Sequence, residues 1–117
     1  MSNPEQIEKG TAHIIIEIIE YEPSAVVSKT IVRKTTGNIT ATSVAIGEEM
    51  GEKNSPFDTY VQIIDGVAQV HIDDRIVFLK RGEGMIIPAF SRHSFFADEQ
   101  FKMLTTVIKS GYDENLE

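Results

Sequence analysis

The sequence predicts an all-β protein, a jelly-roll barrel made of two antiparallel sheets. Its 117 residues suffice for one domain with one core. From Thr11 onward, short runs rich in β-branched residues alternate with turn residues, and about eight to ten such runs fit a double-sheet jelly roll. We expect a flexible N-terminal segment over residues 1–10, one barrel domain over residues 11–110 and an acidic tail over residues 111–117.

The first half of the chain contains three expected strands. Residues 13–19 are apolar on both alternating faces, so this strand needs cover on two sides. Either a second subunit or the barrel with its own terminus could provide that cover. Residues 25–32 and 39–46 flank the sequence Thr-Thr-Gly-Asn, which is typical of a turn, and they predict a hairpin.

The second half supplies the remaining strands, which we expect at residues 60–64, 67–72, 76–79, 85–87, 94–96 and 101–108. The dipeptide Asp65-Gly66 favours a type I′ turn between the first two of these strands. Asp73-Asp74 marks the next turn. Pro88 ends the strand at residues 85–87, because proline cannot donate a hydrogen bond to a central ladder. Thr59, Val61 and Ile63 alternate with Tyr60 and Gln62, so if the first three face the barrel interior, the other two lie on the opposite face.

Composition excludes several classes of function. A net charge of −7 argues against a nucleic-acid partner, because such binding depends on clustered Lys and Arg. No apolar run approaches the roughly 20 residues of a membrane span. Cysteine is absent, so disulfides and thiol chemistry are excluded. The polar start of the chain lacks the pattern of a signal peptide, and we therefore expect a cytoplasmic protein.

Two stretches keep the spacing of a paired motif. The spacing G-x5-H-x-H-x3-E-x6-G is reproduced by Gly47, Lys53, Ser55, Thr59 and Gly66, and the spacing G-x5-P-x4-H by Gly82, Pro88 and His93. This frame, over residues 39–108, resembles the cupin family, and more closely its small single-domain conserved-barrel members of the RmlC-like superfamily. The resemblance implies a double-stranded β-helix. It also implies a divalent metal held by two histidines and a glutamate from the first motif and one histidine from the second.

Most of the implied metal ligands are replaced in this chain. Lys53, Ser55 and Thr59 stand where three ligands would be, and only His93 remains. A lysine must lose its proton to bind a metal, and hydroxyls are poor neutral donors. We therefore expect no cofactor. The alternative is a weakly bound divalent ion, Zn, Mn, Fe or Ni, held by His93 together with Glu52 or Asp58.

The resemblance also places His93 in a cavity. We expect the ligand pocket to contain His93, Lys53, Thr59, Ser55, Val61, Ile63, Met85, Ile87, Phe95 and Met103. His93 is then either a polar anchor or general base of an apolar pocket, or a core histidine bonded to backbone. Lys53 either lies at the mouth, where it favours an anionic ligand, or is an exposed loop lysine. Phe90 stands where the second motif usually carries glycine, which changes the loop.

These features predict a small-molecule-binding protein with a degenerate metal site, which acts as a binding or sensing domain with little or no catalysis. The ligand is expected to be small, organic and anionic. The alternative is a metal-dependent enzyme of the dioxygenase, isomerase or decarboxylase type. A metal-free isomerase would need a proton donor such as Tyr60, which the strand alternation directs away from the cavity. The apolar residues 13–19, with the habit of the family, predict a homodimer.

Overall fold

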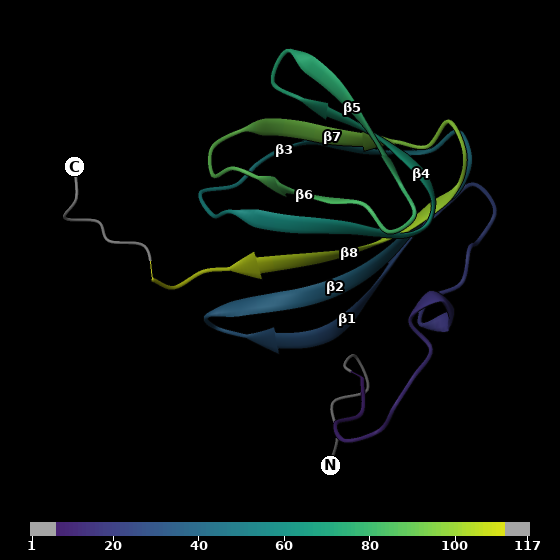
Figure 1. Ribbon diagram of the computed structural model, residues 1–117, viewed down its shortest axis with the longest axis vertical. Coiled ribbons are helices and arrows are strands. Elements are labelled where there is room, and N and C mark those ends of the chain that lie inside the picture. Colours follow the sequence, from purple (N-terminus) through teal and green to yellow (C-terminus); the bar gives the residue numbers. More distant parts are fainter. Residues whose placement is uncertain (1–6, 112–117) are drawn as a thin grey trace.

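The computed structural model describes residues 7–111, which form two curled antiparallel sheets around a common core (Figure 1). One short 3-10 helix, η1 (Ile15–Glu17), precedes the strands. The strands are β1 (Val26–Lys34), β2 (Gly37–Val44), β3 (Glu49–Asn54), β4 (Thr59–Ile72), β5 (Arg75–Lys80), β6 (Gly84–Ile87), β7 (Arg92–Phe96) and β8 (Phe101–Ile108). The predicted all-β jelly roll is confirmed. No helix in the described part is long and apolar enough to cross a membrane.

The long strand β4 joins the two sheets. Its first half pairs with β6 and β8, which gives a first sheet in the order β1-β2-β8-β4-β6. Its second half pairs with β5 and β7, which gives a second sheet in the order β3-β7-β4-β5. The hairpin predicted before and after Thr35-Thr36 is present as β1 and β2. Residues 49–54, for which no strand is predicted, form the edge strand β3.

The expected turn at Asp65-Gly66 was wrong. Both residues lie inside β4, where the register against β8 shifts between Ile63 and Asp65. Gly66 has a φ of 76°, and a Cβ there would overlap the backbone carbonyl of Gln100 and lie 2.9 Å from the Cα of Phe101. A positive φ serves a bulge as well as a hairpin turn. The Asp-Gly pair therefore bends β4 from one sheet into the other.

The expected strand at residues 13–19 is also absent. This segment is extended at Ile14 and then forms η1, after which Ile18 and Ile19 are buried against Ala41 on the outer face of the first sheet. Ile14 remains 61% exposed. The segment is therefore covered at one end only. Ile18 and Ile19 pack on its own barrel, whereas Ile14 faces solvent. Ile7 packs on the same cluster, and its N–H donates to the Ile31 carbonyl at 3.2 Å.

A buried lysine attaches this N-terminal segment to the barrel. Lys102 of β8 is 7% exposed, and its Nζ donates to the carbonyl oxygen of Ile16 at 2.6 Å. The same ammonium lies 4.9 Å from the centre of the Tyr21 ring, a cation–π distance. The Tyr21 hydroxyl donates to Asp65 Oδ2 at 2.6 Å. Burial, together with this hydrogen bond and the carboxylate charge, raises the pKa of Tyr21 above its ordinary value. We call these residues, Tyr21, Asp65 and Lys102, the clamp.

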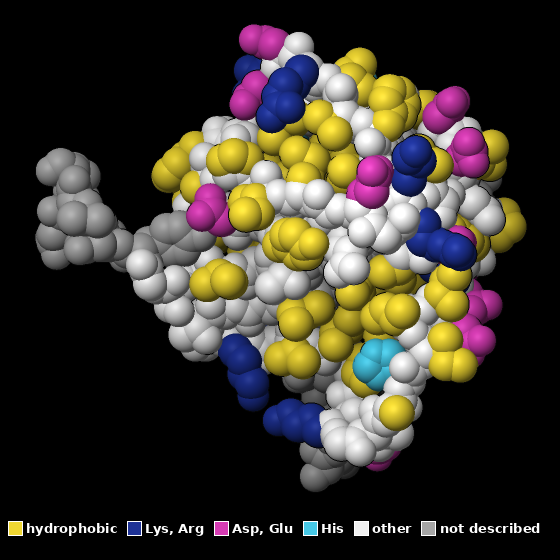
Figure 2. All heavy atoms as spheres, viewed as in Figure 1, with side chains coloured by type: hydrophobic (Ala, Val, Ile, Leu, Met, Phe, Trp, Pro, Cys, Tyr) yellow, Lys and Arg dark blue, Asp and Glu magenta, His cyan; other side chains and the backbone are white. Residues whose placement is uncertain are grey.

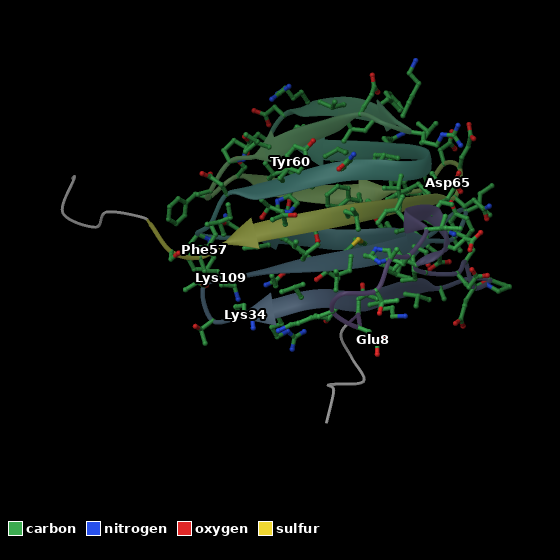
Figure 3. The ribbon with its side chains drawn as sticks, turned by 60° about the horizontal axis from the view of Figure 1, so that its bottom comes forward. Glu8, Lys34, Phe57, Tyr60, Asp65 and Lys109 are labelled. Atoms are coloured by element: carbon green, nitrogen blue, oxygen red, sulfur yellow. The ribbon has the colours of Figure 1, made fainter. Side chains whose placement is uncertain are left out.

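The clamp and the open end of the barrel are far apart. Figure 3 shows Asp65 beside the N-terminal segment, whereas Phe57, Lys34 and Lys109 lie at the opposite end of the strands. Between them the core is filled by inward side chains of both sheets, among them Val44, Val61, Ile63, Ala68, Val70, Ile72, Phe95, Phe101 and Met103. These core side chains fill the barrel interior near the clamp, and the cavity between the two sheets lies toward the other end.

Candidate functional site

A cavity of about 260 Å³ opens between the two sheets, near the start of β4 and the end of β8. It is slightly smaller than the roughly 300–1,000 Å³ of ordinary ligand pockets, so it suits a small molecule. Its lining residues are Ser28, Thr40, Thr42, Met50, Lys53, Ser55, Thr59, Val61, His93, Phe95, Met103, Thr105 and Val107. Strands of both sheets contribute, and each alternates, so that every second side chain points inward.

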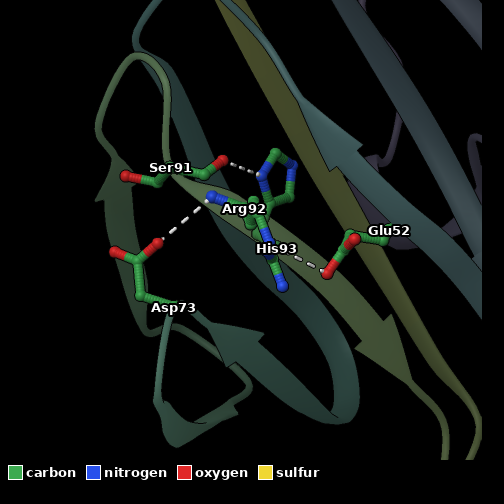
Figure 4. Close-up of polar contacts among 5 residues, drawn as sticks. All are labelled: Glu52, Asp73, Ser91, Arg92 and His93. Atoms are coloured by element: carbon green, nitrogen blue, oxygen red, sulfur yellow. Dashed lines mark hydrogen bonds and ion pairs between the residues drawn. The ribbon is translucent and has the colours of Figure 1, made fainter.

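His93 is the most deeply placed titratable residue of this cavity. It lies in β7 and is 7% exposed, with its ring edge-to-face on Phe95 at 5.8 Å between centres. Its Nδ1 lies 3.3 Å from the carbonyl oxygen of Ser91 (Figure 4). That oxygen can only accept, so Nδ1 carries a proton and donates. In the neutral imidazole Nε2 is therefore an acceptor. Nε2 has no hydrogen-bond partner within residues 7–111. Because every fully buried side-chain polar atom there has a partner, Nε2 is not fully buried.

Lys53 lies directly across the strand pair from His93. The two residues are register partners in the antiparallel ladder of β3 and β7, and paired residues project to the same face of a sheet. Lys53 is exposed, whereas His93 is buried, and both line the cavity. The ammonium therefore belongs to the mouth and the imidazole to the interior. The cavity is lined by no carboxylate, which makes this side of it electropositive.

The opposite wall is rich in hydroxyl groups. Register places Ser28, Thr42 and Met103 in one row across β1, β2 and β8, and Thr40, Thr105 and Val61 in the next row across β2, β8 and β4. The sequence alone does not predict this wall. Hydroxyl residues alternate in the run Ile-Thr-Ala-Thr of β2 and are adjacent in the run Met-Leu-Thr-Thr of β8, and they form one surface only through strand pairing.

The remaining predicted pocket residues divide into two groups. Ser55, Thr59, Val61, Phe95 and Met103 line the cavity together with His93 and Lys53. Ile63, Met85 and Ile87 do not. Ile63 and Ile87 belong to the closed core, and Met85 packs against that core while partly buried.

The two carboxylates considered as substitute metal ligands have other partners. Glu52 forms an ion pair with Arg92 at 3.4 Å on the exposed edge of β3 and β7 (Figure 4), and Asp58 Oδ1 accepts the Ala89 N–H at 2.8 Å. Within residues 7–111, no three or more His, Asp or Glu side chains come together as a metal site would require. One imidazole, an ammonium and hydroxyls do not fit a transition metal.

The loop before β7 has an unusual backbone at the mouth. Phe90 adopts a φ of 68° and is 72% exposed, an uncommon conformation for an aromatic residue. Its N–H donates to the carbonyl of the cavity residue Ser55 at 2.6 Å. Phe90 thus has a left-handed backbone conformation, which a glycine would adopt without strain. Its hydrogen bond to Ser55 holds this strained loop against the rim of the cavity.

Comparison with known proteins supports the fold. A scan against models of protein families and a search of curated proteins found no match. Among solved structures, the conserved SPY1581 protein of unknown function from Streptococcus pyogenes is 30% identical with a TM-score of 0.86, over 96% of this chain and 98% of that one. A cupin 2 conserved barrel domain protein from Leptotrichia buccalis is 32% identical with a TM-score of 0.77, over 80% of this chain but only 46% of that one. A cupin superfamily protein from Desulfitobacterium hafniense is 24% identical with a TM-score of 0.83, over 89% and 95%.

The two-sheet barrel and these matches define a cupin fold, a double-stranded β-helix. At 30% identity over almost the whole of both chains, the protein belongs to the same family as the streptococcal protein.

Proposed function

We propose that this protein binds a small organic anion in the barrel cavity, as a binding or sensing domain with little or no catalysis. The observation that supports this most is His93, a buried imidazole with Nδ1 bonded to backbone and Nε2 left for a ligand. Buried polar groups normally have hydrogen-bond partners, so a histidine with one free nitrogen in a cavity is suited to bind a solute.

Lys53 makes the cavity favour an anionic ligand. Its ammonium lies at the mouth, opposite His93 in the β3–β7 ladder, and no carboxylate lines the cavity to compensate it. An anion that entered there would meet a cation and an imidazole before it reached Val61, Phe95 and Met103. Partial exclusion of water strengthens such a charge interaction relative to one on the open surface.

The catalytic alternatives have less support. The metal-dependent enzyme needs Glu52 or Asp58 beside His93, and both carboxylates are bound elsewhere. The metal-free isomerase needs a proton donor near the imidazole. Tyr60 is 44% exposed on the outer face of β4, whereas its neighbours Thr59 and Val61 line the cavity.

Titration with hexanoate, followed by the amide NMR signals of the protein, tests the proposal. We expect saturable shifts at Lys53, Thr59 and His93. Lys53→Met should weaken binding about threefold to tenfold, because it removes the cationic partner of the carboxylate. His93→Leu should not weaken hexanoate binding, because Nε2 is an acceptor and a carboxylate has no proton to donate to it. Lys109→Met, which removes an exposed lysine outside the cavity lining, is the matched control and should bind like the original protein.

Two outcomes would contradict the proposal: no saturable shift, or an affinity for hexanoate that Lys53→Met leaves unchanged. Elemental analysis of protein purified without added metal tests the alternative. A stoichiometric metal that is lost in His93→Leu would favour the metal-dependent enzyme.

We also propose a homodimer, now on a different surface. A cross-strand row of Ile86, Tyr60, Thr106 and Ile39 crosses the outer face of the first sheet. Ile86 is 62% and Tyr60 44% exposed, and Figure 2 shows hydrophobic side chains gathered over these strands. Exposed apolar clusters of this kind favour association, and a twofold axis would bring the row against itself.

Light scattering at micromolar concentration tests this association. We expect a dimer that Ile86→Lys converts to a monomer, because a charge would be buried in the interface. Ile46→Lys is the control, since Ile46 is 67% exposed but lies after β2, outside the row. A monomeric original protein would refute the dimer.

A further inference from the structure

We infer that the ligand is a polyhydroxylated monocarboxylate, such as a sugar acid with a six-carbon chain. The inference rests on the proposed function and specifies the chemistry of the part of the ligand that lies inside the cavity. Its basis is the hydroxyl wall opposite Lys53 and His93.

The cavity has two chemically different walls. The second sheet contributes the ammonium of Lys53 and the imidazole of His93. The first sheet contributes the hydroxyls of Ser28, Thr40, Thr42 and Thr105. Packed sheets lie about 10 Å apart, so a chain of about six carbons can reach from one wall to the other. Lys53 is the one cationic side chain in the lining, which favours a ligand with a single negative charge.

Hydroxyl side chains make up six of the thirteen lining residues, namely Ser28, Thr40, Thr42, Ser55, Thr59 and Thr105. Some already have partners: Ser28 Oγ and Thr42 Oγ1 lie 3.1 Å apart. Thr40 and Thr59 have no side-chain hydrogen bond within the described residues, although Thr59 is only 9% exposed. Their hydroxyls therefore open to the cavity. An aliphatic ligand would remove water from these groups without replacing its hydrogen bonds, which weakens its binding relative to a ligand that carries hydroxyls.

The pattern of donors and acceptors selects hydroxyls over other polar groups. The neutral imidazole of His93 offers Nε2 as an acceptor, which a ligand hydroxyl can satisfy and a carboxylate cannot. Threonine hydroxyls both donate and accept, as sugar hydroxyls do. A cationic amine would find no carboxylate in the lining to pair with its charge. In this arrangement Lys53 binds the ligand carboxylate, and His93 and the threonines bind the ligand hydroxyls.

Competing titrations with gluconate and hexanoate test the inference, since the two anions share a carboxylate and six carbons but differ in hydroxyl groups. We expect gluconate to bind at least tenfold more tightly, as sites built to bond a hydroxyl reject analogues that lack it. Thr40→Val and Thr42→Val, which keep side-chain volume, should each reduce that ratio several-fold and leave hexanoate binding no weaker. Thr35→Val, in the exposed turn between β1 and β2 and outside the cavity lining, is the matched control.

The possible results separate the two proposals. Equal affinity for both anions, or a gluconate preference that survives both cavity variants, would overturn the polyhydroxylated ligand and leave anion binding intact. Absence of binding by either anion would overturn both. A thermal melt of each variant confirms that it is folded before its affinity is compared, and Thr105→Val replaces either cavity variant that fails to fold.

Discussion

Replacement of Gly66 by alanine is expected to destabilise the protein by about 2–6 kcal/mol. The residue has a φ of 76°, which costs a residue with a Cβ roughly 1–3 kcal/mol. The new methyl would also overlap the Gln100 carbonyl and lie 2.9 Å from the Phe101 Cα. Both contacts are with backbone, so relief requires β4 and β8 to separate, and overpacking of this kind adds about 1–3 kcal/mol. Urea denaturation measures the loss.

Gly82 provides the matched control. Its φ is 89°, so the conformational cost is similar, but a methyl group there would meet no atom within 4 Å beyond its chain neighbours. Gly82→Ala should therefore lose only this conformational cost, about 1–3 kcal/mol. If both substitutions had the same effect, the close passage of β8 beside Gly66 would be contradicted, and a hairpin turn at Asp65-Gly66 would again be tenable.

Replacement of Lys102 by alanine should have the next largest effect, a loss of about 2–4 kcal/mol. It removes a charged hydrogen bond to the Ile16 carbonyl and the contact with the Tyr21 ring. Hydrogen bonds of charged groups contribute about 1.5–3 kcal/mol, and a partly desolvated cation–π contact up to about 2 kcal/mol. We expect hydrogen exchange at Ile18 and Ile19 to accelerate more than exchange in β4, because the clamp holds the segment that contains them.

Two further variants define the role of the clamp. Lys102→Met keeps most of the apolar stem and should recover part of the loss, since long side chains also stabilise by packing. Lys109→Ala removes an exposed lysine and should change stability by less than about 0.5 kcal/mol. A Lys102→Ala protein as stable as Lys109→Ala would show that the N-terminal segment is held by Ile18 and Ile19 alone.

Much of the barrel was predictable because its signals are local. The turn at Thr35-Thr36, the turn at Asp73-Asp74 and the strand closed by Pro88 were placed correctly from neighbouring residues. Alternation also put Thr59, Val61 and Ile63 on one face of the strand, and the structure shows all three to be buried. The strand β3 was missed because Glu49–Asn54 is polar, and an edge strand with exposed side chains carries no hydrophobic alternation.

Two errors have a common physical origin. An Asp-Gly pair permits a positive φ, but only the strand packed beside it decides whether that φ makes a turn or a bulge. A run of isoleucines demands cover, but only the surrounding fold decides what covers it. Here Ile18 and Ile19 meet the first sheet, and the clamp fixes them there.

The sequence by itself predicted the cupin barrel, because the motif residues stand at fixed spacings. It also singled out His93 and Lys53. The tertiary structure alone decided that these two side chains face a wall of hydroxyls from β1, β2 and β8, and that Ile63 and Met85 stay outside the cavity. Such a wall depends on the register of strands distant in sequence, which alternation within any one strand does not specify.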